Sequence, residues 1–189
     1  MKNILLIFIL SISIIYFEGC LTIESKEYTF ELDKGLSGHG SIKFINILSV
    51  NKDSIGTIET DYSELMDSYY KGDKIKEELS GVKNLKKRLY EEDNQLCGEV
   101  SFDFDDISKL KFYKYKDKGP WCYYLSILSM GLLGGTESYF ASNGTYGGDN
   151  MPIIFWDEGQ KEFNFKTAIT SPGKSTISLL QMWKEKGEN

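Results

Sequence analysis

The sequence predicts an α+β fold in which an antiparallel sheet of hairpins packs against two or three helices in a single domain. Three observations lead to this prediction. Alternating polar and apolar residues recur in strand-length stretches, short segments with helical spacing lie between them, and the intervening turns are polar or rich in Gly. The 189 residues are 41% apolar and include only three prolines, which indicates a folded chain with one core.

The first hairpin is predicted to begin at Tyr28, where apolar and polar residues alternate through Leu32. Residues 34–40 hold three glycines and favour a turn. A second strand starts at Ser41, and the parity of its apolar residues changes at Ile45. That change predicts either a bulge or a strand that is buried on both faces.

Two short helices are predicted next. Asp61 has the position of an N-cap, and the acidic Glu64 follows three residues later, near the positive end of the helix dipole. Gly72 is predicted to end this helix. Asp73 is then expected to cap a second short helix that ends at Gly81.

A second hairpin is predicted after Gly81, although a continued helix also fits the spacing of the apolar residues. A polar turn at 91–94 and clear alternation over 98–104 favour strands. Residues 110–115 are expected to extend again. The apolar stretch 121–133 is expected to be a buried strand or a core helix, because it is shorter than the roughly 20 residues that span a bilayer.

The C-terminal third is predicted to contain a loop region, a hairpin and a helix. Residues 134–150 hold five glycines and form a long loop, or two strands joined by loose turns. Residues 152–156 and 163–166 are expected to pair as a last hairpin. Residues 175–186 have helical spacing and close the chain as an amphipathic helix.

The N-terminal segment has the layout of an export signal. Lys2 precedes an apolar run over residues 4–17, which is too short to span a bilayer, and the segment ends at Gly19-Cys20. Gly19-Cys20 resembles the lipobox of bacterial lipoproteins, in which the cysteine is diacylated and becomes the mature N-terminus. The alternatives are an uncleaved N-terminal anchor and a buried cysteine in a core helix.

This resemblance implies three parts: a lipoprotein signal peptide at 1–19, a lipidated cysteine and tether at 20–26, and a globular domain at 27–189. Palmitate-type acyl chains on Cys20 would hold the protein in the membrane of a bacterial cell envelope. Leu21 stands where aspartate commonly retains lipoproteins in the inner membrane. The resemblance therefore favours the outer membrane, with the domain in the periplasm.

Cys97 and Cys122 remain once Cys20 is acylated. An even pair of cysteines in an exported protein predicts a disulfide, because that compartment is oxidising. The bond would close a loop of about 25 residues and stabilise the fold by roughly 3 kcal/mol. The alternative is two buried free thiols.

The middle of the chain resembles the core of LppM-like bacterial lipoproteins. Its motifs are Gly81-Val82, Leu89-Tyr90, Cys97-Gly98-Glu99-Val100-Ser101-Phe102 and Asp106-Ile107-Ser108-Lys109-Leu110. The resemblance implies an α+β envelope domain with lipid or glycolipid contacts and no catalytic site. Members of that family often end in a transmembrane helix, whereas this chain ends in the polar residues 184–189.

Few residues suggest catalysis or metal binding. His39 is the only histidine and stands between two glycines, which is more typical of an exposed turn than of a catalytic dyad. The acidic runs at 91–93 and 103–106 have the residue types of a calcium site or an acid/base pair, but strand ends and solvated turns explain them more simply. We therefore predict no metal, no cofactor and no catalytic residue.

A Gly-rich region offers the best candidate for recognition. Tyr139, Asn143 and Tyr146 lie between Gly134 and Gly148. Tyrosine and asparagine on such a loop suit contacts with sugars or with a protein partner. The alternative is a mobile loop whose tyrosines pack against the edge of the sheet.

Charge and motifs together favour a non-enzymatic role. The formal net charge of −6 makes nucleic acid a poor partner. The leading expectation is a lipid-anchored binding or scaffold module that contacts an envelope protein, a lipid or a glycan. The alternatives are a carrier with an apolar cavity between sheet and helices, and a glycan-acting enzyme that uses paired carboxylates.

Overall fold

The computed structural model describes residues 21–50, 55–114, 116, 119–125, 136–170 and 175–187. The predicted signal peptide, Cys20 and most of the apolar stretch 121–133 lie outside the described residues. Within them the fold is α+β: two sheets whose described strand pairs are all antiparallel, with a few short helices. The predicted fold class is thus confirmed at this level.

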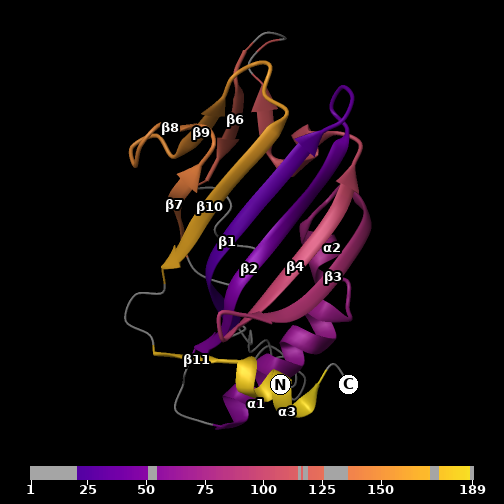
Figure 1. Cartoon of the computed structure of the whole chain (residues 1–189), viewed down its shortest axis with the longest axis vertical. Coiled ribbons are helices and arrows are strands. Elements are labelled where there is room, and N and C mark those ends of the chain that lie inside the picture. The colour runs from indigo at the N-terminus through magenta and orange to yellow at the C-terminus, as the bar shows by residue number, and fades with distance from the viewer. Residues whose placement is uncertain are drawn as a thin grey trace, which may run out of the picture.

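The larger sheet has seven strands, six of which follow the order β3-β4-β2-β1-β10-β7 (Figure 1). The seventh, β11, pairs with the end of β2. We call this assembly the large sheet. Its strands are β1 (Leu21–Leu32), β2 (Gly38–Val50), β3 (Val82–Glu92), β4 (Gln95–Phe104), β7 (Thr136–Ser142), β10 (Glu162–Thr170) and β11 (Thr176–Ser178).

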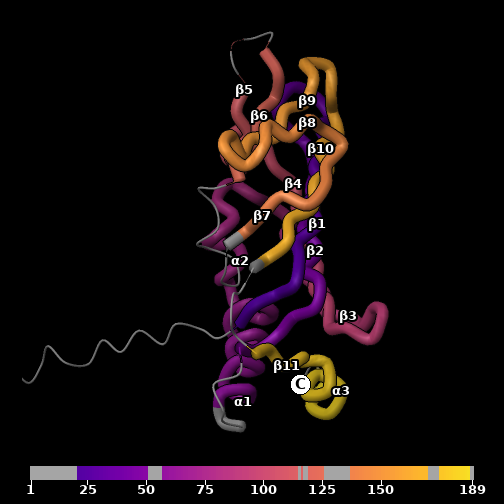
Figure 2. Tube along the Cα trace, turned by 90° about the vertical axis from the view of Figure 1, so that its left-hand side faces the viewer, coloured from indigo at the N-terminus to yellow at the C-terminus, as the bar shows by residue number. Residues whose placement is uncertain are grey.

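The small sheet has four strands in the order β5-β6-β9-β8. It lies at one end of the molecule, and α1 lies at the other (Figure 2). Its strands are β5 (Phe112–Lys114), β6 (Trp121–Tyr124), β8 (Thr145–Tyr146) and β9 (Ile153–Trp156).

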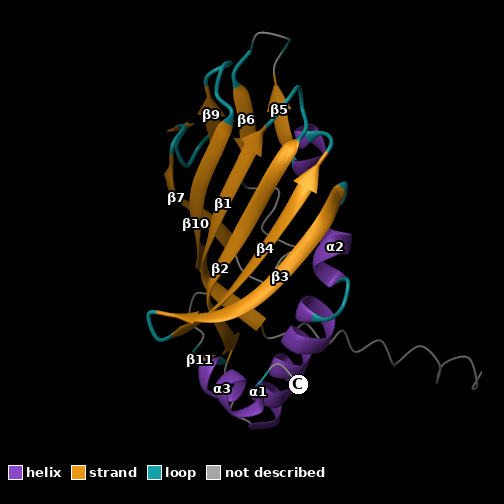
Figure 3. Ribbon diagram, turned by 45° about the vertical axis from the view of Figure 1, so that its right-hand side comes forward, coloured by secondary structure: helices purple, strands orange, loops and turns teal. Residues whose placement is uncertain are grey.

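The helices are short. α1 (Ile55–Glu64) continues without a break into a π-helical turn, η1 (Leu65–Tyr70), and α2 (Lys74–Glu78) follows (Figure 3). A 3₁₀ turn, η2 (Ile107–Leu110), precedes β5, and α3 (Leu180–Lys186) closes the described chain. None of these described helices has the length and hydropathy that a membrane crossing requires.

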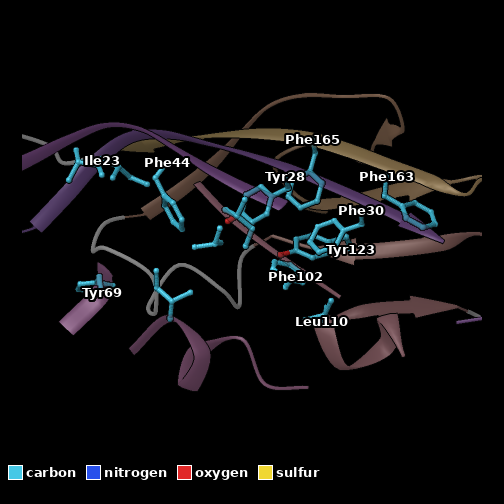
Figure 4. Close-up of a cluster of buried hydrophobic side chains, with 14 of the residues drawn as sticks. Ile23, Tyr28, Phe30, Phe44, Tyr69, Phe102, Leu110, Tyr123, Phe163 and Phe165 are labelled. Atoms are coloured by element: carbon cyan, nitrogen blue, oxygen red, sulfur yellow. The ribbon is translucent and has the colours of Figure 1, made fainter. Parts of the chain in front are cut away.

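The core contains a dense aromatic cluster between the two sheets (Figure 4). Phe30 of the large sheet meets the ring of Phe112 at 5.0 Å, and Phe165 meets that of Tyr123 at 4.6 Å. Burial of each such side chain contributes about 1.5–3 kcal/mol. Buried residues of η1 and α2 belong to the same cluster.

Two glycines that suggested a turn lie inside β2 instead. A Cβ atom at Gly38 would stand 1.8 Å from the carbonyl oxygen of Glu31, and one at Gly40 would stand 3.0 Å from the ring of Phe102. Glycine is required here by close packing of neighbouring groups rather than by a turn. The predicted turn at 34–40 is therefore shorter than expected, and β2 begins at Gly38.

Strand β1 also begins earlier than predicted. Residues 21–26, expected to be a tether, pair with β2 from Leu21 onward. At the change of parity in β2, Asn46 has a left-handed φ of 56°, and both Phe44 and Ile47 are buried in the core on either side of it. The pairing of β1 with β2 shows no shift of register there.

The helical predictions are partly right. Asp61 is not an N-cap, because α1 already begins at Ile55, and its buried carboxylate accepts a hydrogen bond from the hydroxyl of Ser49. Asp73 does stand at the N-cap of α2, although its side chain makes no capping hydrogen bond. The strand expected after Gly81 is confirmed as β3.

The predicted last hairpin is wrong in its pairing. The strands exist, but β9 belongs to the small sheet and β10 to the large sheet, so the turn at 157–159 connects two layers. The region 134–150 contains the two strands β7 and β8, one of the two predicted alternatives. The first part of the predicted C-terminal helix is β11, and only Leu180–Lys186 is helical.

Candidate functional site

A cavity of about 90 Å³ lies on the inner face of the large sheet. Its wall is formed by β1, β2 and β7, by β6 of the small sheet, by the end of α2 and by the turn η2. We call it the charged cavity, because five of its lining residues are lysines or glutamates. These residues are Lys26, Glu78, Lys109, Lys111 and Glu137.

Lys26 and Glu137 form a buried ion pair in this wall. Their side chains expose only 3% and 4% of their surface. Lys26 Nζ donates to Glu137 Oε1, and the hydroxyl of Tyr28 donates to the same oxygen over 3.1 Å. Burial of two charges costs several kcal/mol per ion, which a pair offsets only with good geometry and further hydrogen bonds of this kind.

Two buried tyrosines line the cavity together with the ion pair, and one of them, Tyr28, donates to it. Burial raises the pKa of Tyr123 far above its usual range, and the charge of Glu137 adds to the effect. Burial is also the main cause that raises the pKa of Tyr28, and the nearby Tyr123 and Glu137 raise this pKa further. Both rings pack on Phe165, with centroid distances of 4.4 Å for Tyr28 and 4.6 Å for Tyr123. Both phenols therefore stay protonated at neutral pH and remain hydrogen-bond donors.

Glu78 and Lys111, two of the three remaining charges of the cavity, have no partner among the residues that the structure describes. Glu78 lies at the C-terminal end of α2, and its Oε2 atom is buried without a hydrogen bond. Burial raises the pKa of this carboxyl, and this effect is larger than the lowering of the pKa by the positive charge of Lys74. Lys111 follows η2 in a left-handed conformation, and burial lowers its pKa. Within the described part of the chain Lys111 forms no ion pair or hydrogen bond through its side chain.

A second, shallower groove of about 230 Å³ lies on the outer face of the large sheet. Three of its polar groups already have partners: Asn84 Nδ2 donates to Asp103 over 2.7 Å, and His39 Nε2 lies 3.1 Å from a carboxylate oxygen of Glu31. His39 is thus an exposed residue of strand β2 rather than a turn residue. The charged cavity, with its unpartnered groups, is the stronger candidate for a binding site.

The predicted recognition residues lie near β7 and β8. Tyr139 and Tyr146 stack face to face, with ring centroids 4.0 Å apart. Asn143 is occupied within the fold: its Oδ1 accepts from Trp156 Nε1 at 2.6 Å and from the backbone N–H of Asn164 at 2.9 Å, and its Nδ2 donates to the carbonyl of Glu162. The structure therefore brings the two tyrosines together, whereas the side chain of Asn143 fixes the connection between the sheets.

Cys97 and Cys122 are free thiols in the structure, which differs from the predicted disulfide. Cys97 lies in β4 of the large sheet and Cys122 in β6 of the small sheet, and these strands are not neighbours. Burial raises the pKa of both thiols. They are accordingly weak nucleophiles at neutral pH.

The acidic runs have structural roles. Asp105 pairs with Lys83, and Asp106 caps η2 by accepting from the backbone N–H of Ser108 at 2.9 Å. Hydrogen bonds from Ser108 lower the pKa of Asp106. Across the described ranges no three His, Cys, Asp or Glu side chains gather in a way that could hold a metal ion.

The residues of the charged cavity were missed in the sequence, although one signal was present. Lys26 has the same parity as Tyr28, Phe30 and Leu32, so a lysine stands in the register of the buried face of a strand. A charge in such a position needs a buried partner. The sequence could not identify Glu137 as that partner, because 111 residues separate the two.

Comparison of the chain with protein-family models, with curated proteins and with solved structures finds no match. The resemblance to LppM-like lipoproteins therefore stays a prediction from short motifs. The function must be argued from the residues themselves.

Proposed function

We propose that this protein is a lipid-anchored lipoprotein of the bacterial envelope that binds a small charged ligand in the charged cavity and catalyses no reaction. The observation that carries the ligand site is the pair of unpartnered groups in the cavity, Glu78 Oε2 and Lys111 Nζ. The apolar run that ends at Gly19-Cys20 supports the anchor. The single hydrophobic cluster shared by sheets and helices supports one globular domain.

The chemistry of the cavity favours a zwitterion. An ammonium group would give Glu78 the partner that it lacks, and a carboxylate or phosphate would do the same for Lys111, with Lys109 beside it. The volume of about 90 Å³ corresponds to roughly three water molecules at about 30 Å³ each. A ligand of the size of a small amino acid, or the head group of a larger molecule, fits this space.

The buried ion pair would hold the ligand site in shape. Lys26, Glu137 and Tyr28 satisfy one another, so they do not compete for the ligand's charges. Their fixed positions would keep the cavity open beside Glu78 and reduce the ordering that binding requires. On this proposal, the ion pair is structural and the unpartnered charges make the contacts.

The two alternatives have less support. A carrier of apolar ligands needs an apolar cavity of several hundred Å³. The charged cavity is smaller than this and is lined by lysines and glutamates. A carboxylate enzyme needs two carboxyl groups that can exchange protons with a substrate. Glu78 and Glu137 do come from distant segments, and burial raises the pKa of Glu78. Glu137, however, is tied to Lys26 and Tyr28.

Isothermal titration calorimetry with glycine, alanine and phosphoethanolamine tests the ligand site, with ethylamine and acetate as singly charged controls. Binding of a zwitterion is expected to weaken about tenfold or more in Glu78→Gln and Lys111→Gln, since each loses a charge-assisted hydrogen bond. Glu77→Gln is the matched control, because Glu77 is exposed on the same helix and does not line the cavity. Equal weakening in all three variants, or no binding of any probe, would contradict the proposed site.

The intact mass of the protein purified from its native membrane tests the anchor. A mass that corresponds to residues 20–189 plus acyl chains is expected. A mass that retains residues 1–19 without acyl chains would exclude the lipoprotein proposal. Measurement before and after reduction also shows whether Cys97 and Cys122 are bonded in the cell.

A further inference from the structure

We infer that one end of the molecule rests directly on the surface of the membrane that holds the acylated Cys20. This inference depends on the proposed lipid anchor. The end in question, which we call the base, consists of the start of β1, the end of β2, β11, α1 and α3. In two views, α1 and α3 lie beyond the lower end of the large sheet, next to β11 (Figures 1 and 3).

The chain has no tether between the anchor and the fold. Leu21 follows Cys20 directly, is only 4% exposed, and pairs with Ser49 of β2 as the first residue of β1. Consecutive Cα atoms are about 3.8 Å apart. An acylated Cys20 would therefore hold the first rung of the sheet next to the lipid head groups, and the domain could not stand away from the bilayer.

An exposed apolar side chain lies close to this anchor point. Ile177 of β11 pairs with Ser49, which pairs in turn with Leu21, so the three residues form one row across β11, β2 and β1. Two strand spacings separate Ile177 from Leu21, or about 10 Å. Ile177 is 36% exposed. A branched aliphatic side chain at this place is suited to contact with the lipid interface.

The basic residues of the base are already neutralised within the fold. Lys186 lies 3.7 Å from Glu59 and joins α3 to α1, and Lys184 lies 2.7 Å from Glu91 and joins α3 to β3. The hydroxyl of Tyr62 also donates to the carbonyl of Gly187 over 2.8 Å. The base is thus a connected surface whose lysines are ion-paired, so its contact with lipid should not require anionic head groups.

This arrangement sets the height of the ligand site. Lys26 lies five residues beyond Leu21 on β1, which places the charged cavity about 17 Å from the base at about 3.3 Å per residue. The far end of β1, at Leu32, lies about 36 Å away by the same measure. The cavity would then face the layer of solution immediately above the head groups.

Fluorescence quenching of the full acylated protein in phosphatidylcholine vesicles tests the inference. A fluorophore is attached at Ile177→Cys in a background of Cys97→Ala and Cys122→Ser, and the vesicles carry a nitroxide on the lipid head group. The matched control places the fluorophore at Leu36→Cys, which is also exposed but lies in the turn beyond the far end of β1. A second control inserts a ten-residue Gly/Ser spacer between Cys20 and Leu21.

We expect strong quenching at position 177, none above background at position 36, and no change when salt is added. The spacer is expected to reduce quenching at 177 while the protein still floats with the vesicles. Equal quenching at both positions would overturn the inference. The inference would also be overturned if the protein itself already shielded the fluorophore at position 177 from solvent in detergent without vesicles. Failure of the proposed anchor gives a different result, since the protein would then not float with the vesicles at all.

Discussion

Replacement of Lys26 by Met is expected to destabilise the protein by about 3–5 kcal/mol, because it leaves the buried carboxylate of Glu137 without its partner. The two side chains are nearly inaccessible, so water cannot take over the role of the lysine. The hydroxyl of Tyr28 still donates to Glu137 over 3.1 Å. That remaining hydrogen bond places the expected loss at the lower end of the range.

The double variant Lys26→Met/Glu137→Met gives the sharper test. Removal of both charges removes the desolvation cost together with the attraction, so most of the lost stability should return. Tyr28 then loses its acceptor, which costs about 1 kcal/mol. Lys43→Met is the matched control, because Lys43 is also an ion-paired strand lysine but lies on the exposed face with Glu92. Its expected cost is below about 1 kcal/mol.

Urea unfolding followed by tryptophan fluorescence measures these differences. Trp121 and Trp156 are buried in the aromatic cluster and report on its loss. The slope of the free energy of unfolding against urea should be the same for all variants, so that shifts of the midpoint give the changes in stability. The reasoning would be refuted if Lys26→Met cost no more than Lys43→Met, or if the double variant were as unstable as the single one.

Three further predictions follow from the same contacts. Asn143→Ala should lower the free energy of unfolding by about 2–3 kcal/mol, because it removes three hydrogen bonds that include the one from Trp156, and unchanged urea unfolding would contradict this. Glu78→Gln should raise stability at pH 7 but not below about pH 4, since burial raises the folded-state pKa of this carboxyl and its ionisation therefore costs stability as the pH rises. With Cys97 and Cys122 free, a thiol reagent should modify both in unfolded, unreduced protein and neither quickly in the folded state; a mass that rises by about 2 Da on reduction would contradict this.

Local patterns in the sequence identified most of the strands, because alternation along a strand is set by burial of one face. Tyr28, Phe30 and Leu32 have the predicted period, and all three are buried. Pairing between strands was harder to predict. The short turn at 157–159 suggested a hairpin, yet β9 and β10 belong to different sheets. A turn sequence restricts the local chain direction but does not specify which neighbour completes the hydrogen bonds.

The candidate site could not be predicted because its members are distant in the chain and ordinary in type. Glu78 is one of two acidic residues at the end of the short helix α2, and only its burial beside Lys111 distinguishes it. Asn143 shows the opposite case. Its position in a Gly-rich region suggested recognition, but the fold uses its side chain to join β7, β9 and β10.

The signs of the expected effects separate the structural charges of the cavity from those that would meet a ligand. Loss of Lys26 should reduce stability and, by deforming the cavity, also reduce binding. Loss of the Glu78 charge should raise stability at neutral pH while it weakens binding, because the carboxylate is held in a partly buried place without a partner. A binding residue is expected to lower the stability of the protein while the cavity is empty and to be required for binding of the ligand. If Glu78→Gln left both quantities unchanged, the unpartnered carboxylate would have no role in ligand recognition.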